Sequence, residues 1–100
     1  MDFPVQVPID RERITVAGTA IGLTTSKITT QVGCALCQVI TARIWLTTNG
    51  TAPLTDGTIG MYFDPGQYFL LTGPDMLALK VIRNSTTSAA LEVIYYGKGG

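Results

Sequence analysis

The chain has 100 residues, of which 46% are hydrophobic and 14% charged, with seven basic residues, seven acidic residues and no histidine. This length predicts one domain, and low charge with high hydrophobicity excludes intrinsic disorder. The charge balance argues against nucleic-acid binding, and the lack of histidine excludes Ser–His and Cys–His catalysis and every His-containing metal site. A neutral, apolar-leaning surface favours self-association.

The first residues predict an extended N-terminal arm, residues 1–11. Pro4 and Pro8 each lack a backbone donor and fix their own φ angle, so neither suits a central strand. The folded domain is expected at residues 12–97 and a glycine-rich tail at residues 98–100. We expect no signal peptide, because the N-terminus lacks positive charge. We expect no membrane contact, because no apolar run approaches the roughly 18 residues of a spanning helix.

The periodicity of the domain is that of β-strands. Val, Ile, Tyr and an unusual number of Thr residues favour pleated structure, and turn signals such as Asn49–Gly50 and Asp64–Pro65–Gly66 separate short segments. The pattern predicts an all-β fold, a single small β-sandwich or jelly-roll-like domain of about seven to eight antiparallel strands. Strands are expected at residues 14–16, 38–48, 59–63, 67–71, 79–83 and 91–96, a helical or 3₁₀ turn at 76–78, and strand or loop at 20–23 and 27–29.

Two of these strands have apolar residues on both faces. Alternation assigns the uniformly apolar face of residues 38–48 and one face of residues 91–96 to the core. The expected core positions are Ile40, Ala42, Ile44, Leu46, Leu91, Val93 and Tyr95, and the opposite positions include Val39, Arg43, Trp45, Ile94 and Tyr96. In a free monomer those opposite positions should be polar.

Two explanations remain open: the assignment is reversed for one strand, or these residues meet another subunit. We favour subunit contact because the overall charge is so low. The interface is predicted to include a face carrying Trp45 and Tyr96, together with the arm. The predicted contact residues are Phe3, Pro4, Val5, Val39, Arg43, Trp45, Ile94 and Tyr96.

The two cysteines, Cys34 and Cys37, form a C-x-x-C pattern. In a redox enzyme this motif opens a helix after a strand, whereas here it leads into a β-like run. Zinc needs four ligands, so two cysteines serve only across a subunit interface. We interpret them as small buried hydrophobic residues, with a disulfide between subunits as the alternative, and we expect no metal and no cofactor.

The alternatives to a structural function are a hydrolase and a glycan- or receptor-binding module. A hydrolase would need two carboxylates facing each other, but the acidic residues lie mostly in turns and no spacing forces a pair together, so no enzyme is expected. A glycan- or receptor-binding module remains an alternative, because aromatic side chains can form a sugar platform, although they more often serve a core or an interface. The aromatic residues concerned are Trp45, Tyr62, Tyr68, Tyr95 and Tyr96.

The order of turns and strand ends between residues 43 and 96 resembles small virion structural proteins of tailed bacteriophages. The features that carry it are Asn49–Gly50–Thr51–Ala52–Pro53, Pro65–Gly66–Gln67, Ile82–Arg83 and Val93–Ile94–Tyr95–Tyr96. The resemblance implies a β-sandwich without enzymatic activity that is carried in many copies on the particle. A capsid decoration (cement) protein is the first candidate, and a neck, connector or tail accessory protein the second.

The resemblance also implies partners and a location. The major capsid protein or other virion proteins are the expected partners, together with further copies of the chain in a homo-oligomer, for which a trimer is favoured. The expected location is the virion, at the capsid surface, after synthesis in the host cytoplasm.

Overall fold

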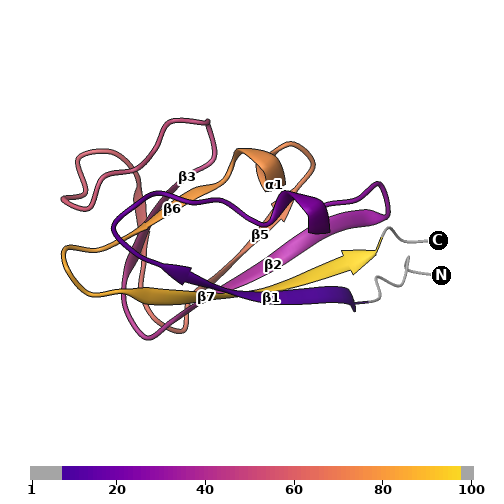
Figure 1. Cartoon of the computed structure of the whole chain (residues 1–100), viewed down its shortest axis with the longest axis horizontal. Coiled ribbons are helices and arrows are strands. Elements are labelled where there is room, and N and C mark those ends of the chain that lie inside the picture. The colour runs from indigo at the N-terminus through magenta and orange to yellow at the C-terminus, as the bar shows by residue number, and fades with distance from the viewer. Residues whose placement is uncertain (1–7, 98–100) are drawn as a thin grey trace.

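Seven β-strands in two antiparallel sheets make up most of the computed structural model, which describes residues 8–97 (Figure 1). One sheet has the strand order β1–β7–β2–β5 and the other β4–β3–β6. The all-β sandwich expected from the sequence is confirmed; a jelly roll has eight strands, and the described residues contain seven. The elements are β1 (Pro8–Val16), a 3₁₀ turn η1 (Thr25–Lys27), β2 (Val32–Ile40), β3 (Ile44–Thr47), β4 (Met61–Phe63), β5 (Tyr68–Thr72), a one-turn helix α1 (Asp75–Ala78), β6 (Lys80–Arg83) and β7 (Ala89–Gly97).

One continuous hydrophobic core lies between the sheets. Its members come from strands of both sheets and include Val39, Leu71, Leu91, Val93 and Tyr95 of the four-stranded sheet and Ile44, Leu46 and Val81 of the three-stranded sheet. The alternation predicted for the last strand is confirmed, because Leu91, Val93 and Tyr95 are fully buried. Burying one such side chain stabilises the fold by about 1.5–3 kcal/mol, so β7 contributes strongly to the core.

A tight turn at Thr41 carries the chain from one sheet to the other. Thr41 has a φ of 76°, and the Ala42 N–H donates to the Ile40 carbonyl at 3.0 Å. The single strand predicted for residues 38–48 is therefore wrong. A positive φ is rare for a β-branched residue, so nothing in the residue types marked this break.

The turn changes which side chains face the core. Val39 points inward from β2 and is only 1% exposed, while Ile44 and Leu46 point inward from β3. The prediction that Val39 lies on an outward, subunit-contacting face is wrong. For this part of the chain the other explanation holds, namely that the faces of the strand were assigned in reverse.

The N-terminal strand forms one edge of the four-stranded sheet. β1 begins at Pro8 and pairs with β7 along its length, so residues 8–11, which the sequence places in the arm, belong to the sheet. Proline is tolerated there because an edge strand can lack a ladder donor. The predicted contact residues Phe3, Pro4 and Val5 and the tail at residues 98–100 lie outside the described residues.

Candidate contact surfaces

The structure separates the predicted contact residues onto opposite sides of the sandwich. Trp45 alternates with the buried Ile44 and Leu46 and therefore lies on the outer side of the three-stranded sheet. Ile94 and Tyr96 alternate with buried residues of β7 and lie on the outer side of the four-stranded sheet. The expectation of one face carrying both Trp45 and Tyr96 is wrong. The outer sides of the two sheets are therefore two separate candidate contact surfaces.

The outer face of the three-stranded sheet carries a cluster of mutually paired side chains. The Trp45 ring meets the Tyr62 ring edge-on, with centroids 5.5 Å apart, and the Trp45 indole N–H donates to the Asn84 side-chain oxygen at 2.9 Å. The Arg43 guanidinium lies 4.1 Å from the Tyr62 ring centroid. Arg43 also donates to Asp64 at 2.6 Å, and this hydrogen bond raises the pKa of Arg43.

Part of this cluster is covered by the chain itself. A Cβ atom placed on Gly57 would lie 2.5 Å from Cζ2 of Trp45, so the backbone of the loop at residues 51–60 rests directly against the indole ring. This contact leaves the Trp45 side chain half-buried, so only part of its ring is accessible to a partner. The five aromatic residues considered as a sugar platform do not form one, since Tyr95 is fully buried and Tyr68 and Tyr96 belong to the other sheet.

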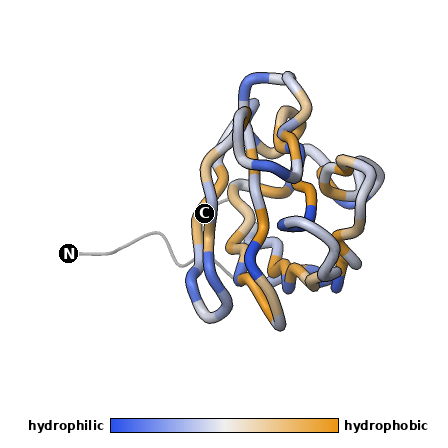
Figure 2. Tube along the Cα trace, turned by 90° about the vertical axis from the view of Figure 1, so that its left-hand side faces the viewer, coloured by the Kyte–Doolittle hydropathy of each residue, from blue (hydrophilic) through white to orange (hydrophobic). Residues whose placement is uncertain are grey.

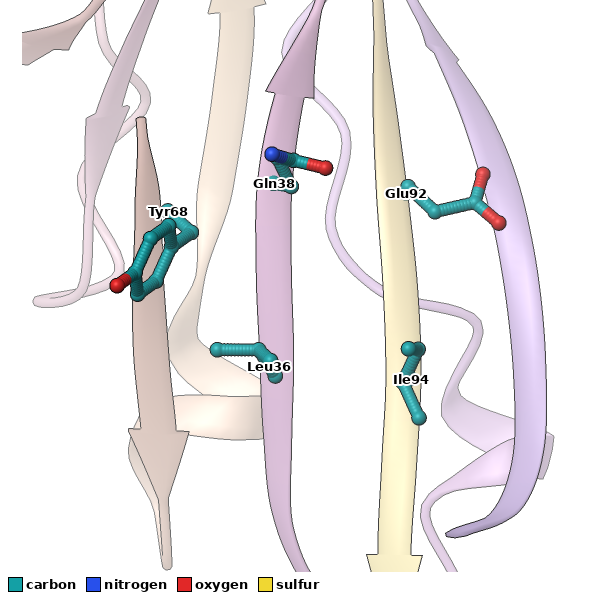
Figure 3. Close-up of a pocket in the computed structure, with 5 residues that line it drawn as sticks. All are labelled: Leu36, Gln38, Tyr68, Glu92 and Ile94. Atoms are coloured by element: carbon teal, nitrogen blue, oxygen red, sulfur yellow. The ribbon is translucent and has the colours of Figure 1, made fainter. Parts of the chain in front are cut away.

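The outer face of the four-stranded sheet carries an apolar row across three strands. Leu36 of β2 is opposite Leu70 of β5 and opposite Ile94 of β7, and we call these three residues the apolar row. Leu70 is 59% exposed, and the neighbouring Tyr68 is 67% exposed. Tyr68, Leu36 and Ile94 line a shallow hollow together with Gln38 and Glu92 (Figure 3).

Charged side chains lie beside this row at β1. Figure 3 shows the Glu92 carboxylate directed toward that strand, where it accepts hydrogen bonds from Arg11 and, at 2.7 Å, from Arg13. These two guanidinium groups lower the pKa of Glu92. The outer face is therefore apolar at Leu70, Leu36 and Ile94 and ionic over β1, with the polar Gln38 beside the row. Figure 2 colours the backbone trace by hydropathy and shows hydrophobic and hydrophilic residues interspersed along the chain.

A polar network closes one part of the core. The Tyr95 hydroxyl donates to the Glu12 carboxylate, which also accepts the Thr24 hydroxyl at 2.5 Å and the Thr24 N–H at 3.2 Å. Burial and the nearby carboxylate raise the pKa of Tyr95, so the phenol keeps its proton and remains a donor. These contacts tie β1 to β7 and to the segment before η1.

Both cysteines are core residues, as the sequence analysis favoured. Cys34 is 3% exposed and Cys37 is 0% exposed, on β2. Removal from water raises the pKa of both thiols, that of Cys37 to about 12. A catalytic thiol needs a lowered pKa and access to its substrate, and these two have neither.

Both thiols are expected to resist a thiol-specific reagent at about pH 8 in the folded protein and to react once denaturant is added, because only the accessible thiolate is nucleophilic. The measurement is the absorbance of the released reagent with and without guanidinium. Fast labelling of the folded chain would contradict the buried placement.

The same burial predicts a loss of stability at alkaline pH. The Cys37 pKa is 9.0 ordinarily and about 12 in the fold, so this group leaves stability unchanged below pH 9 and lowers it as pH rises toward 12. Cys37→Ala should show a shallower alkaline decline in chemical unfolding, and an equal decline would contradict this assignment.

Residues 8–97 contain no group of three His, Cys, Asp or Glu side chains placed to hold a metal ion. Within the same residues no helix is long and apolar enough to cross a membrane.

Sequence reasoning missed several residues of these surfaces. Leu36 was outside any predicted strand, and Leu70 lay in a strand whose two faces are both apolar, which leaves no alternation to read. Asp64 was predicted to lie in a turn and Asn84 lies between two predicted strands, and their pairing with Arg43 and Trp45 appears only once distant segments are in place. No family model matches the chain, and neither does any curated protein or solved structure.

Proposed function

We propose that the protein is a non-enzymatic virion structural protein of a tailed bacteriophage, a capsid decoration protein that stabilises the head through contacts between subunits. The observation that carries this proposal is the apolar row, Leu36, Leu70 and Ile94, on an outer sheet face that is usually polar in an antiparallel sandwich. Leu70 is exposed, while Leu36 and Ile94 are half-buried, and apolar side chains gathered on the outside of a fold mark interaction sites. The resemblance of the turns to small phage virion proteins supplies the class of partner.

Capsid stabilisation needs contact area rather than reactive groups. A shell subunit that covers the apolar row would remove it from water at a gain of about 25 cal/mol for each Å² of apolar surface. The Arg11–Glu92–Arg13 cluster lies at the margin of the row, in keeping with the polar rim that surrounds the centre of most interfaces. A decoration protein uses such a surface to bridge neighbouring shell subunits.

The proposal predicts that the tagged chain co-purifies with the major capsid protein from infected cells. Ile94→Lys should weaken its binding to empty capsids at least tenfold, because a charge introduced into the apolar row must be removed from water when the contact forms. The matched control is Leu54→Lys, at an exposed apolar residue of the loop that covers the three-stranded sheet, which should bind as the unaltered chain does. Binding is measured by co-sedimentation.

Other outcomes of the same experiment separate the alternatives. Recovery of neck, connector or tail proteins instead of the capsid protein would favour the accessory role within the particle. Recovery of no virion protein, or equal loss of binding in Ile94→Lys and Leu54→Lys, would overturn the proposal. A glycan screen of the chain, with Trp45→Ala as its control, tests the binding-module alternative directly.

A further inference from the structure

Three of the four sheet edges in the described residues are protected against pairing with another chain. β1 begins with Pro8 and carries charged side chains at residues 10–13, and proline and charge both discourage edge pairing. The β6 edge is covered by Ile21, whose backbone exchanges hydrogen bonds of 3.0 and 2.7 Å with Val81. β4 is only three residues long, and short edge strands are themselves protective.

The fourth edge, that of β5, has none of these protections. Its five residues, Tyr68–Thr72, include no charge and no proline, and β2 is its only neighbour in the sheet that the described residues form. An uncharged edge of this length is a template for a further strand. Among the described edges, β5 is therefore the one that can accept another chain.

β5 uses only every second residue to pair with β2. The Val39 N–H donates to the Gln67 carbonyl at 2.9 Å, and the pairing continues from there to Thr72 without a shift in register. In an antiparallel pair, residues that exchange hydrogen bonds alternate with residues that do not. Counted from Gln67, the β5 residues that bond to β2 are Phe69 and Leu71.

The other three residues of the strand, Tyr68, Leu70 and Thr72, direct their backbone N–H and C=O groups away from β2. No turn or loop within residues 8–97 donates to these groups or accepts from them. The side chains of the same three residues are exposed on the outer face of the sheet, with Tyr68 at 67% and Leu70 at 59%. The edge thus offers three evenly spaced residues, centred on Leu70.

We propose that the β5 edges of two copies pair with each other in an antiparallel dimer. With Leu70 opposite Leu70 of the second copy, Tyr68 of each chain lies opposite Thr72 of the other. Each of these facing pairs exchanges two hydrogen bonds, so every outward backbone group of the three residues finds a partner. A two-fold contact requires a surface that is complementary to itself, and the symmetric placement of Tyr68 and Thr72 about Leu70 meets this requirement.

Charge and edge protection favour a second copy as the occupant. The chain has no net charge, so two copies do not repel each other at long range. β5 itself carries no charge, so no like charges face each other across the new pair, where they would be destabilising. Because the other described edges are protected, β5 is also the edge that a second copy has to offer.

The pairing joins the apolar rows of the two copies. Leu70 is the end of the row at the β5 edge, so the two Leu70 side chains would be neighbours on the outer face of one continuous sheet. Two copies satisfy each other completely, so the expected oligomer is a dimer and not the trimer expected from the resemblance. The contact lies at the edge and leaves the outer face accessible, so the inference goes beyond the proposed function and does not depend on it.

The first test is the molar mass of the full chain, measured by light scattering after size exclusion. The unaltered chain should be a dimer, and Leu70→Lys should be a monomer, because two lysines would face each other at the centre of the pair. The matched control is Leu54→Lys, at an exposed leucine in the loop over the other sheet, which should remain a dimer. Circular dichroism verifies that each variant is folded.

Introduced cysteines test the register, since Cys34 and Cys37 are buried. Leu70→Cys should form a disulfide between chains under mild oxidation, because facing residues of a hydrogen-bonded pair have Cα atoms about 5.5 Å apart, within the reach of a disulfide. Tyr68→Cys and Thr72→Cys should form this bond only when the two variants are mixed. In either variant alone, the cysteines would lie about 14 Å apart along the strands. Non-reducing electrophoresis measures the product.

The outcomes separate this inference from the proposed function. An unaltered chain that is monomeric or trimeric, a Leu70→Lys variant that stays dimeric, or cross-linking of Tyr68→Cys alone as efficient as that of the mixture would overturn the inference. Ile94→Lys changes the apolar row away from the edge and should remain a dimer while losing capsid binding. A dimeric unaltered chain that fails to bind capsids would overturn the proposed function alone.

Discussion

Replacing Tyr95 with alanine is expected to lower the free energy of unfolding by about 3–5 kcal/mol, the range for removal of a buried aromatic side chain. Tyr95 is fully buried on β7, a central strand of the four-stranded sheet. A domain of this size has a total stability of about 5–15 kcal/mol, so the substitution should remove a large fraction of it. Chemical unfolding followed by circular dichroism measures the change.

The neighbouring residue is the matched control. Tyr96 is the same residue type, one position along the strand, on the outer face, so Tyr96→Ala should cost about 1 kcal/mol or less. Equal costs at Tyr95 and Tyr96 would contradict the assignment of the two faces of β7.

Tyr95→Phe isolates the contribution of the hydroxyl group. The ring stays, but the Glu12 carboxylate loses one donor and retains Thr24. A hydrogen bond to a charged group contributes about 1.5–3 kcal/mol, so the loss should fall between those of Tyr96→Ala and Tyr95→Ala. In the background of Thr24→Val, the two losses should not be additive, because both donors share one carboxylate.

The last strand shows what the sequence could predict. Leu91, Val93 and Tyr95 alternate with Glu92, Ile94 and Tyr96 over a segment free of glycine and proline, and the burial follows that period of two. The one-turn helix α1 was also foreseen at Met76–Ala78, because Gly73–Pro74 stops the preceding strand. Local residue chemistry decided these elements, so they are readable without tertiary contacts.

The turn at Thr41 shows what the sequence could not predict. Residues on both sides of it are β-formers with continuous alternation, and the break consists of one threonine with a positive φ. Its cause is global, because the chain must leave one sheet and enter the other for both apolar faces to meet. This single turn placed Val39 in the core and moved Trp45 to the opposite side of the sandwich from Tyr96.

The contact surfaces were predictable only in part. An excess of apolar residues over what one core needs was visible in the composition, and the structure locates part of it in the apolar row and the β5 edge. Which strands stand side by side is set by pairings far apart in sequence, such as Leu36 with Leu70 and with Ile94. Such a row cannot be assembled from any local window of residues.

Replacing Gly57 with alanine should destabilise the protein by about 2–4 kcal/mol, through backbone strain at a left-handed position and overpacking against an aromatic ring. Gly57 has a φ of 79°, and an added Cβ would lie 2.5 Å from Trp45 Cζ2. The loop cannot easily retreat, because the Gly57 N–H donates to the Leu54 carbonyl and the Leu54 N–H to the Ile59 carbonyl, both at 3.0 Å.

Gly50→Ala is the control variant, because it introduces backbone strain without overpacking. Gly50 has a similar φ of 86°, but an added Cβ there would meet nothing within 4 Å, so Gly50→Ala should cost only about 1 kcal/mol. The chain has one tryptophan, so its emission reports on Trp45 alone. Gly57→Ala should shift that emission to longer wavelength as the loop lifts from the ring, while Gly50→Ala should leave it unchanged. Equal costs and unchanged emission in both variants would mean that the loop does not cover Trp45, and the outer face of the three-stranded sheet would then be open for contact with a partner.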